Sequence, residues 1–94
     1  MAKDTVLIVE DDLDIVELLQ YTLERDGYPV IVAHSGEKGL AEAQRRKPGL
    51  IVLDLMLPGL DGLEVCKALK SDAATRGIPI VMLTAKGEES DVIL

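Results

Sequence analysis

Acidic and hydroxyl side chains directly follow three short apolar segments of this chain. The segments and the residues after them are 6–9 with Glu10, Asp11 and Asp12, 50–53 with Asp54, and 80–83 with Thr84 and Ala85. Carboxylates that lie close together repel one another and raise one another's pKa, a penalty that a divalent cation removes. Because the candidate ligands are all oxygen atoms, Mg²⁺ or Mn²⁺ fits better than Zn²⁺. An aspartate beside such an ion can attack a phosphorus centre, so these residues indicate metal binding and phosphoryl chemistry.

The three apolar segments are expected to be strands of one parallel sheet, because they are short, rich in β-branched residues and separated by helix-like sequence. The sequence predicts strands at 5–9, 29–33, 50–54 and 79–84, and helices at 13–26, 36–46, 62–71 and from about 88. This alternation implies a doubly wound α/β fold with right-handed crossovers, and short chains of this kind commonly have the flavodoxin-like strand order 2-1-3-4. In that order Glu10, Asp11 and Asp54 meet at the carboxyl edge of two adjacent strands.

Each helix should bury one apolar face. In the first helix, the residues with the spacing of such a face are Ile15, Leu18, Leu19, Thr22 and Leu23. Residues that favour helix ends occur where the pattern changes: Asp12 or Asp14 and Ser35 as N-caps, and Gly27 and Pro48-Gly49 as terminators. We expect Cys66 on the inward side of the third helix, and His34 as a solvated loop residue.

Length and composition favour one domain, residues 1–94, with an aliphatic core, because apolar residues make up 48% of the chain and aromatic residues 2%. The net charge of −7 argues against nonspecific nucleic-acid binding, which needs a basic face. No apolar stretch approaches the roughly 20 residues of a membrane span, and the N-terminus lacks the apolar segment of a signal peptide. A single cysteine cannot form an internal disulfide, which favours a reducing, cytoplasmic location.

Three segments of the sequence resemble the receiver domain of two-component response regulators: 6–12 (VLIVEDD), 53–62 (LDLMLPGLDG) and 79–86 (PIVMLTAK). They occur in the family's order and at its intervals, and the segment around Asp54 is the most specific. The pattern is especially similar to receivers of winged-helix transcription regulators. The resemblance implies a phosphoacceptor module that takes a phosphoryl group from a sensor histidine kinase, catalyses only its own phosphorylation and switches a downstream output, transcription.

The resemblance also implies roles for individual residues. Asp54 would be the phosphoacceptor, and its carboxylate would also be a Mg²⁺ ligand. Asp11 would bind Mg²⁺ directly, the Met56 backbone carbonyl would supply a further ligand, and Glu10 would act through water. Thr84 would hydrogen-bond the phosphoryl group and move toward it.

Ala85 would keep the approach to the phosphoryl group open. The family's fifth strand, which ends in a lysine, and its last helix are also implied, but the sequence stops before them, and Lys86 is not that lysine. We therefore expect a fragment, or a fold whose remainder comes from another chain, with impaired phosphorylation. The outer edge of the strand at 79–84 would then be unpaired, which favours self-association through this fourth strand.

Two other functions fit part of the pattern. A magnesium-dependent phosphatase also uses an aspartyl nucleophile on a doubly wound sheet, but its pattern has a second aspartate two residues later, where this chain has Met56. The third interpretation is a structural or interaction fragment of a receiver domain, in which the acids serve only the fold. Mg²⁺ binding separates this interpretation from the first two, and steady phosphatase turnover separates the second from the first.

Overall fold

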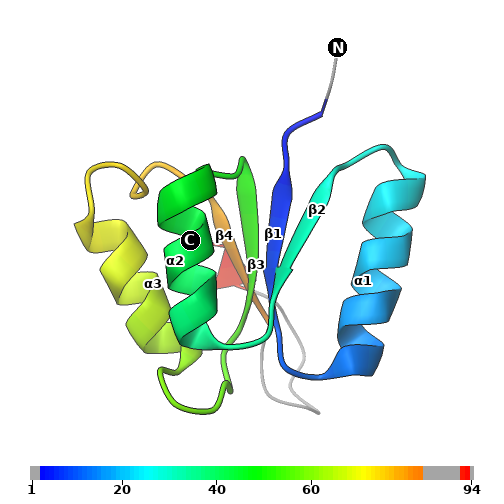
Figure 1. Cartoon of the computed structure of the whole chain (residues 1–94). Coiled ribbons are helices and arrows are strands. Elements are labelled where there is room, and N and C mark those ends of the chain that lie inside the picture. The colour runs from blue at the N-terminus through cyan, green and yellow to red at the C-terminus, as the bar shows by residue number, and fades with distance from the viewer. Residues whose placement is uncertain (1–2, 84–91, 94) are drawn as a thin grey trace.

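The computed structural model describes residues 3–83 and 92–93, which form one sheet with helices on both faces (Figure 1). In chain order the elements are β1 (Val6–Val9), α1 (Leu13–Arg25), β2 (Val30–Ala33), α2 (Gly36–Arg46), β3 (Leu50–Asp54), α3 (Gly62–Ser71), β4 (Ile80–Leu83) and β5 (Val92–Ile93). The strands lie in the order β2-β1-β3-β4-β5, and the first four are parallel to one another. The predicted flavodoxin-like order 2-1-3-4 is therefore confirmed. Among the described residues, no helix is both long enough and apolar enough to cross a membrane.

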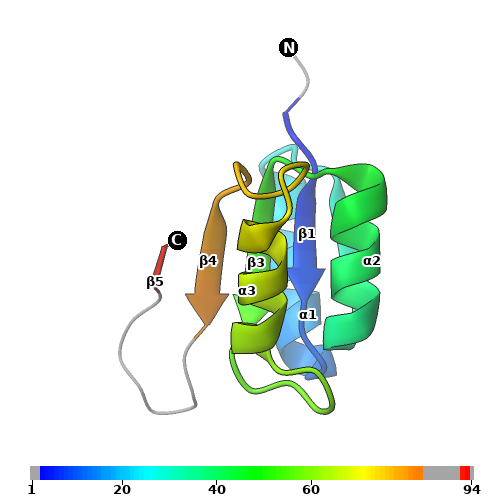
Figure 2. The same ribbon diagram turned by 90° about the vertical axis from the view of Figure 1, so that its left-hand side faces the viewer.

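The core lies on both faces of the sheet. All four residues of β1 are buried, and successive side chains of a strand point to opposite faces. Leu7 and Val9 belong to the cluster beneath α2 and α3, whereas Val6 and Ile8 pack with Val16 of α1 on the other face (Figure 2). The buried residues of both clusters are aliphatic apart from one cysteine and one methionine. The aliphatic core and the inward position of the cysteine are thus as predicted.

The buried face of α1 is narrower than the sequence predicts. Leu19 and Leu23 pack against the sheet as expected, but Ile15 is 38% exposed and Leu18 is 66% exposed. Val16, which the prediction omits, is the buried residue of this helix. The inward face is centred on positions 16, 19 and 23, so the two exposed residues fall on its flanks.

A short strand, β5, pairs antiparallel with the outer edge of β4, and in the backbone register Val81 is paired with Ile93 and Met82 with Val92 (Figure 2). The prediction of a helix from about residue 88 is therefore wrong at 92–93. The prediction that the outer edge of the fourth strand is unpaired is wrong at Val81 and Met82. Pairing satisfies backbone groups of β4 that a free edge would expose. β5 is not the implied strand that ends in a lysine, and that strand and the last helix are lacking among residues 3–83 and 92–93. Self-association through β4 stays a prediction, and because β5 covers part of the β4 edge, less of that edge is free than expected.

The N-terminal ends of α1 and α2 are capped by predicted residues. Asp12 Oδ1 accepts the backbone N–H groups of Asp14 at 2.9 Å and Ile15 at 3.3 Å. The choice left open between Asp12 and Asp14 is thereby decided for Asp12. Ser35 Oγ accepts the backbone N–H of Lys38 at 3.2 Å, which caps α2.

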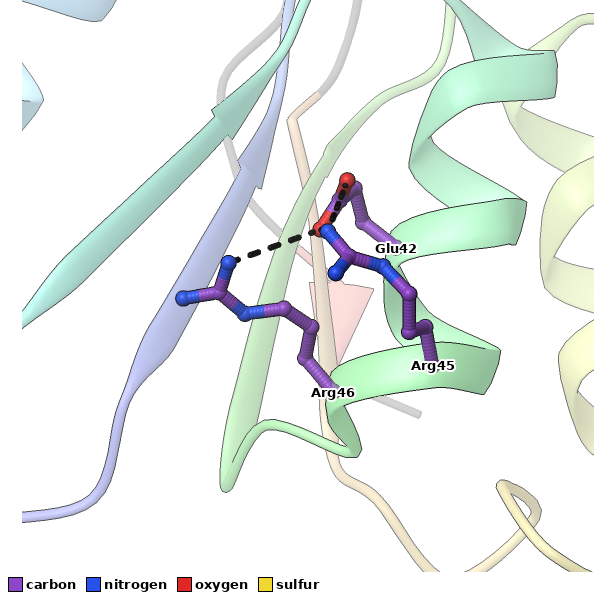
Figure 3. A network of polar contacts seen from close by, with 3 residues as sticks. All are labelled: Glu42, Arg45 and Arg46. Carbon is purple, nitrogen blue, oxygen red and sulfur yellow. Dashed lines mark hydrogen bonds and ion pairs between the residues drawn. The ribbon is translucent and has the colours of Figure 1, made fainter.

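The C-terminal end of α2 is formed by Lys47, immediately before the predicted Pro-Gly terminator. Lys47 has a left-handed backbone, with φ 45°. In the last turns of α2, both oxygens of the Glu42 carboxylate accept hydrogen bonds of 2.8 Å from Arg45 Nη2, and Oε1 lies 4.0 Å from Arg46 Nη1 (Figure 3). Positive charge at this end also complements the helix dipole. The basic residues Arg45, Arg46 and Lys47 therefore have a structural role at the C-terminal end of α2.

The packing of α2 on β1 leaves no room for a side chain at Gly39. An added Cβ would lie 2.6 and 2.7 Å from the two methyl carbons of Val9. We predict that Gly39→Ala lowers the free energy of unfolding by about 1–3 kcal/mol, the usual cost of overpacking. Gly77→Ala is the matched control, because no atom lies within 4 Å of its added Cβ. Urea unfolding measures both variants, and wild-type stability of Gly39→Ala would contradict this close packing.

Candidate functional site

Three carboxylate side chains meet at the carboxyl edge of the sheet. Glu10 and Asp11 follow β1, Asp54 is the last residue of β3, and an oxygen of each lies within 4.8 Å of the other two. The strand register explains this convergence. Val9 of β1 pairs with Leu53 of β3, so the next residues, Glu10 and Asp54, lie side by side at the same edge of the sheet. The predicted convergence is thus present. The donor set consists of oxygen atoms, which suits a hard divalent cation.

Glu10 is the buried member of this group, with 2% of its surface exposed. Its backbone N–H donates to the Ala33 carbonyl at 3.0 Å, and its Oε2 accepts the Asp12 N–H at 3.0 Å. Burial removes water from the carboxylate and raises the pKa of Glu10 to about 7; the nearby Asp54 and Asp11 carboxylates add to the rise, and the Asp12 N–H opposes it. The charge of Glu10 is therefore costly unless a cation lies nearby.

Asp54 is half-buried and begins a tightly bonded loop. Its Oδ1 accepts the Met56 backbone N–H at 3.0 Å, and the Leu55 carbonyl accepts the Gly62 N–H at 3.1 Å. Gly62 lies so close to this strand end that an added Cβ would collide with the Asp54 carbonyl oxygen. The sequence analysis did not predict that Gly62 is needed for this close approach, although a glycine in the first turn of a predicted helix was an available signal. The Met56 side chain is 65% exposed, which suits a residue that acts through its backbone.

Two residues of the predicted site, Thr84 and Ala85, lie outside the described residues. Leu83, which directly precedes them, pairs with Asp54 in the β3–β4 register, and its carbonyl accepts the Leu55 N–H at 3.1 Å. The roles of Thr84 and Ala85 stay predictions.

His34 is an exposed loop residue, as predicted, and its ring also contacts the backbone of another loop. Its Nδ1 lies 3.1 Å from the backbone carbonyl oxygen of Glu10. Because a carbonyl oxygen only accepts hydrogen bonds, Nδ1 is the donor. The contact joins the segments that follow β1 and β2, and no local sequence pattern indicates it.

An open hollow of about 400 Å³ lies along α1, lined by Leu13, Val16, Glu17, Gln20, Tyr21 and Glu24. None of the three clustered carboxylates lines it. Because its walls come from a single helix, we assign the functional site from the chemistry of the carboxylate group rather than from the size of the hollow.

Known proteins are similar in sequence to this chain over most of its length. Residues 6–93 match the family described as the response regulator receiver domain. The alkaline phosphatase synthesis transcriptional regulatory protein PhoP of Bacillus subtilis is 56% identical over 89 residues, which are 95% of this chain and 36% of PhoP. The phosphate regulon transcriptional regulatory protein PhoB of Pseudomonas aeruginosa is 46% identical over 93 residues, which are 99% of this chain and 41% of PhoB. The chain thus spans about two fifths of the length of these curated relatives.

Solved structures share the fold. The N-terminal domain of a response regulator receiver protein from Methanoculleus marisnigri has a TM-score of 0.85 at 43% identity, over 92% of this chain and 70% of that one. The Mn²⁺-bound form of the response regulator Rcp1 has a TM-score of 0.83 at 31% identity, over 93% and 69%. With this fold, with carboxylates gathered at its carboxyl edge and with a family match from residue 6 to residue 93, the chain belongs to the response regulator receiver domains of two-component systems.

Proposed function

We propose that this chain is a phosphoacceptor signalling module that takes a phosphoryl group from a sensor histidine kinase onto Asp54 in the presence of Mg²⁺. The observation that carries the proposal is the group of Glu10, Asp11 and Asp54, held together by adjacent parallel strands. Membership of the receiver family supports the histidine kinase as the partner. The names of the curated relatives support transcription as the output, and with it a cytoplasmic location.

The carboxylate group fits a hard divalent cation, because Mg²⁺ prefers oxygen ligands and typically takes one or two carboxylates. We assign the Asp11 and Asp54 carboxylates and the Met56 backbone carbonyl as direct ligands, with Glu10 acting through water. When bound, Mg²⁺ would neutralise negative charge on the carboxylates and on the phosphoryl oxygens. A nearby cation also favours the ionised form of the buried Glu10.

Asp54 supplies the nucleophile. Its Oδ1 accepts the Met56 N–H with one lone pair and can hold Mg²⁺ with the other, and we assign Oδ2 as the atom that attacks phosphorus. A P–O bond forms while the P–N bond to the kinase histidine breaks, and the electron pair stays with the imidazole, which takes up a proton. The product is an acyl phosphate, and no external substrate is turned over. Thr84 would hydrogen-bond the phosphoryl group, and Ala85 would leave its approach open.

The identity of the phosphoacceptor can be tested by mass. Incubation of the chain with acetyl phosphate and Mg²⁺ should add one phosphoryl group to a fraction of the molecules, because impaired phosphorylation is expected. Asp54→Asn should abolish the gain because an amide is a poor nucleophile, and removal of Mg²⁺ should abolish it because the bare carboxylates repel the phosphoryl group. Intact-mass spectrometry measures the gain in each case.

Asp26→Asn is the matched control, because it changes the same charge at the opposite end of α1. This variant should be labelled like the wild type. Labelling of Asp54→Asn to the wild-type extent would show that another residue is the acceptor. Continuous release of phosphate would favour a phosphatase instead.

Glu10 should make the metal-free protein less stable as the pH rises. Its pKa is about 7 in the folded chain against an ordinary value of 4.5, so the folded state holds this proton more tightly than the unfolded state. The resulting loss of folding stability is absent below pH 4.5, grows between pH 4.5 and 7 and is complete above pH 7. From the size of the shift, it amounts to at most about 3 kcal/mol.

Glu10→Gln removes the charge and keeps an oxygen that can accept the Asp12 N–H. In EDTA, we expect this variant to be more stable than the wild type at about pH 8 and equally stable near pH 4. Urea unfolding measures the difference, with the exposed Glu17→Gln as the control. Mg²⁺ should narrow the difference at high pH by stabilising the wild type. A variant that is less stable than the wild type at high pH would contradict a costly charge at Glu10.

A further inference from the structure

Residues 34–37, the turn after β2 together with the first two residues of α2, contact the loop that carries Glu10 and Asp11. His34, the single histidine of the sequence, donates from Nδ1 to the Glu10 carbonyl oxygen at 3.1 Å. Ala33, the last residue of β2, accepts the Glu10 N–H at 3.0 Å. The backbone of Glu10 is therefore held through both its N–H and its carbonyl by the end of β2 and this turn.

The same turn contacts the loop that follows Asp54. The Glu37 carboxylate accepts the backbone N–H of Leu60 at 3.3 Å. Gly36 lies against the same residue, because an added Cβ would collide with the Leu60 carbonyl oxygen. Gly59 has φ 70°, and a Cβ there would lie 3.0 Å from Glu37 Oε2. The start of α2 therefore fixes the far side of this loop at residues 59–60.

We propose that the turn at residues 34–37 is a positioning element for the carboxylate site. It ties the loop of Glu10 and Asp11 to the loop that follows Asp54, and so sets the separation of the ligands. The inference rests on the proposed function. A metal held by two loops binds weakly if the loops must first be ordered, because ordering costs conformational entropy. Hydrogen bonds from residues that do not touch the ion orient its ligands and remove part of that cost.

A positioning role differs measurably from a purely structural one. If the contacts of His34 and Glu37 served only the fold, their loss would lower stability and leave the Mg²⁺ affinity of the folded chain unchanged. If they position the site, the Mg²⁺ affinity of the folded chain falls as well. A substitution that restores the hydrogen bond then restores Mg²⁺ binding.

The test uses variants of the whole chain. Glu37→Ala and His34→Ala each remove one contact. Glu37→Gln keeps an acceptor for the Leu60 N–H without the charge, and His34→Asn keeps a donor at a similar position. Glu42→Ala is the matched control, because it removes a carboxylate from the same helix more than one turn further along.

Titration with Mg²⁺, followed through the ¹⁵N amide shifts of residues 10–12, 55–57 and 59–61, gives the dissociation constant, and urea unfolding gives the stability. We expect each alanine variant at 34 and 37 to bind Mg²⁺ roughly fivefold more weakly, the change that loss of one hydrogen bond produces. Glu37→Gln, His34→Asn and Glu42→Ala should stay within about twofold of the wild type. In the metal-free protein, the Leu60 amide shift should change in Glu37→Ala and be retained in Glu37→Gln.

Unchanged Mg²⁺ binding in both alanine variants would overturn the proposal. Equal weakening in Glu37→Ala and Glu37→Gln would also overturn it, because the effect would then belong to charge rather than to the hydrogen bond. Failure of the proposed function looks different, since the wild type itself would show no Mg²⁺-dependent shifts, and both inferences would then fall together.

Discussion

Mutual repulsion among three carboxylates is the constraint on which the rest of this structure depends. Glu10, Asp11 and Asp54 offer oxygens within 4.8 Å of one another. Side chains of like charge would move apart on a flexible chain, but the parallel ladder fixes Val9 opposite Leu53 and so fixes where both loops begin. The two aliphatic clusters on either face of the sheet hold that ladder in place. The fold therefore maintains an unfavourable arrangement that becomes favourable when a cation is present.

The two acids at the strand ends each accept a backbone hydrogen bond at the same sequence separation. Glu10 accepts the N–H of Asp12 and Asp54 accepts the N–H of Met56, in each case from the residue two positions later and at 3.0 Å. For Asp54 this is the turn that short polar side chains form with the backbone that follows them, whereas Glu10 accepts the equivalent N–H with a longer side chain. Each hydrogen bond engages one carboxylate oxygen and leaves the other for a cation or a phosphorus atom. The backbone thus orients both carboxylates, and within residues 3–83 and 92–93 neither carboxylate forms an ion pair with a basic side chain.

The convergence of the acids was predictable because parallel strands end at a common edge, and the strand pattern is present in a single sequence. Predictions failed where tertiary packing decided the outcome. Ile15 has the helical spacing of a buried residue, but the sheet meets the flank where Val16 lies. The contacts of His34 and Glu37 join segments remote in sequence, which no periodicity encodes. At 92–93, pairing with the edge of β4 replaces the expected helix, and local propensity does not include that contact.

Asp12 connects the carboxylate site to α1. Its N–H donates to Glu10, while its side chain caps the first turn of the helix. The positive end of the α1 dipole therefore faces the carboxylates, and their negative charge stabilises this end of the helix. A proton, a cation or a phosphoryl group at the site changes that field. The stability of the first turn of α1, where Leu13 is 68% exposed, therefore depends on the charge of the site.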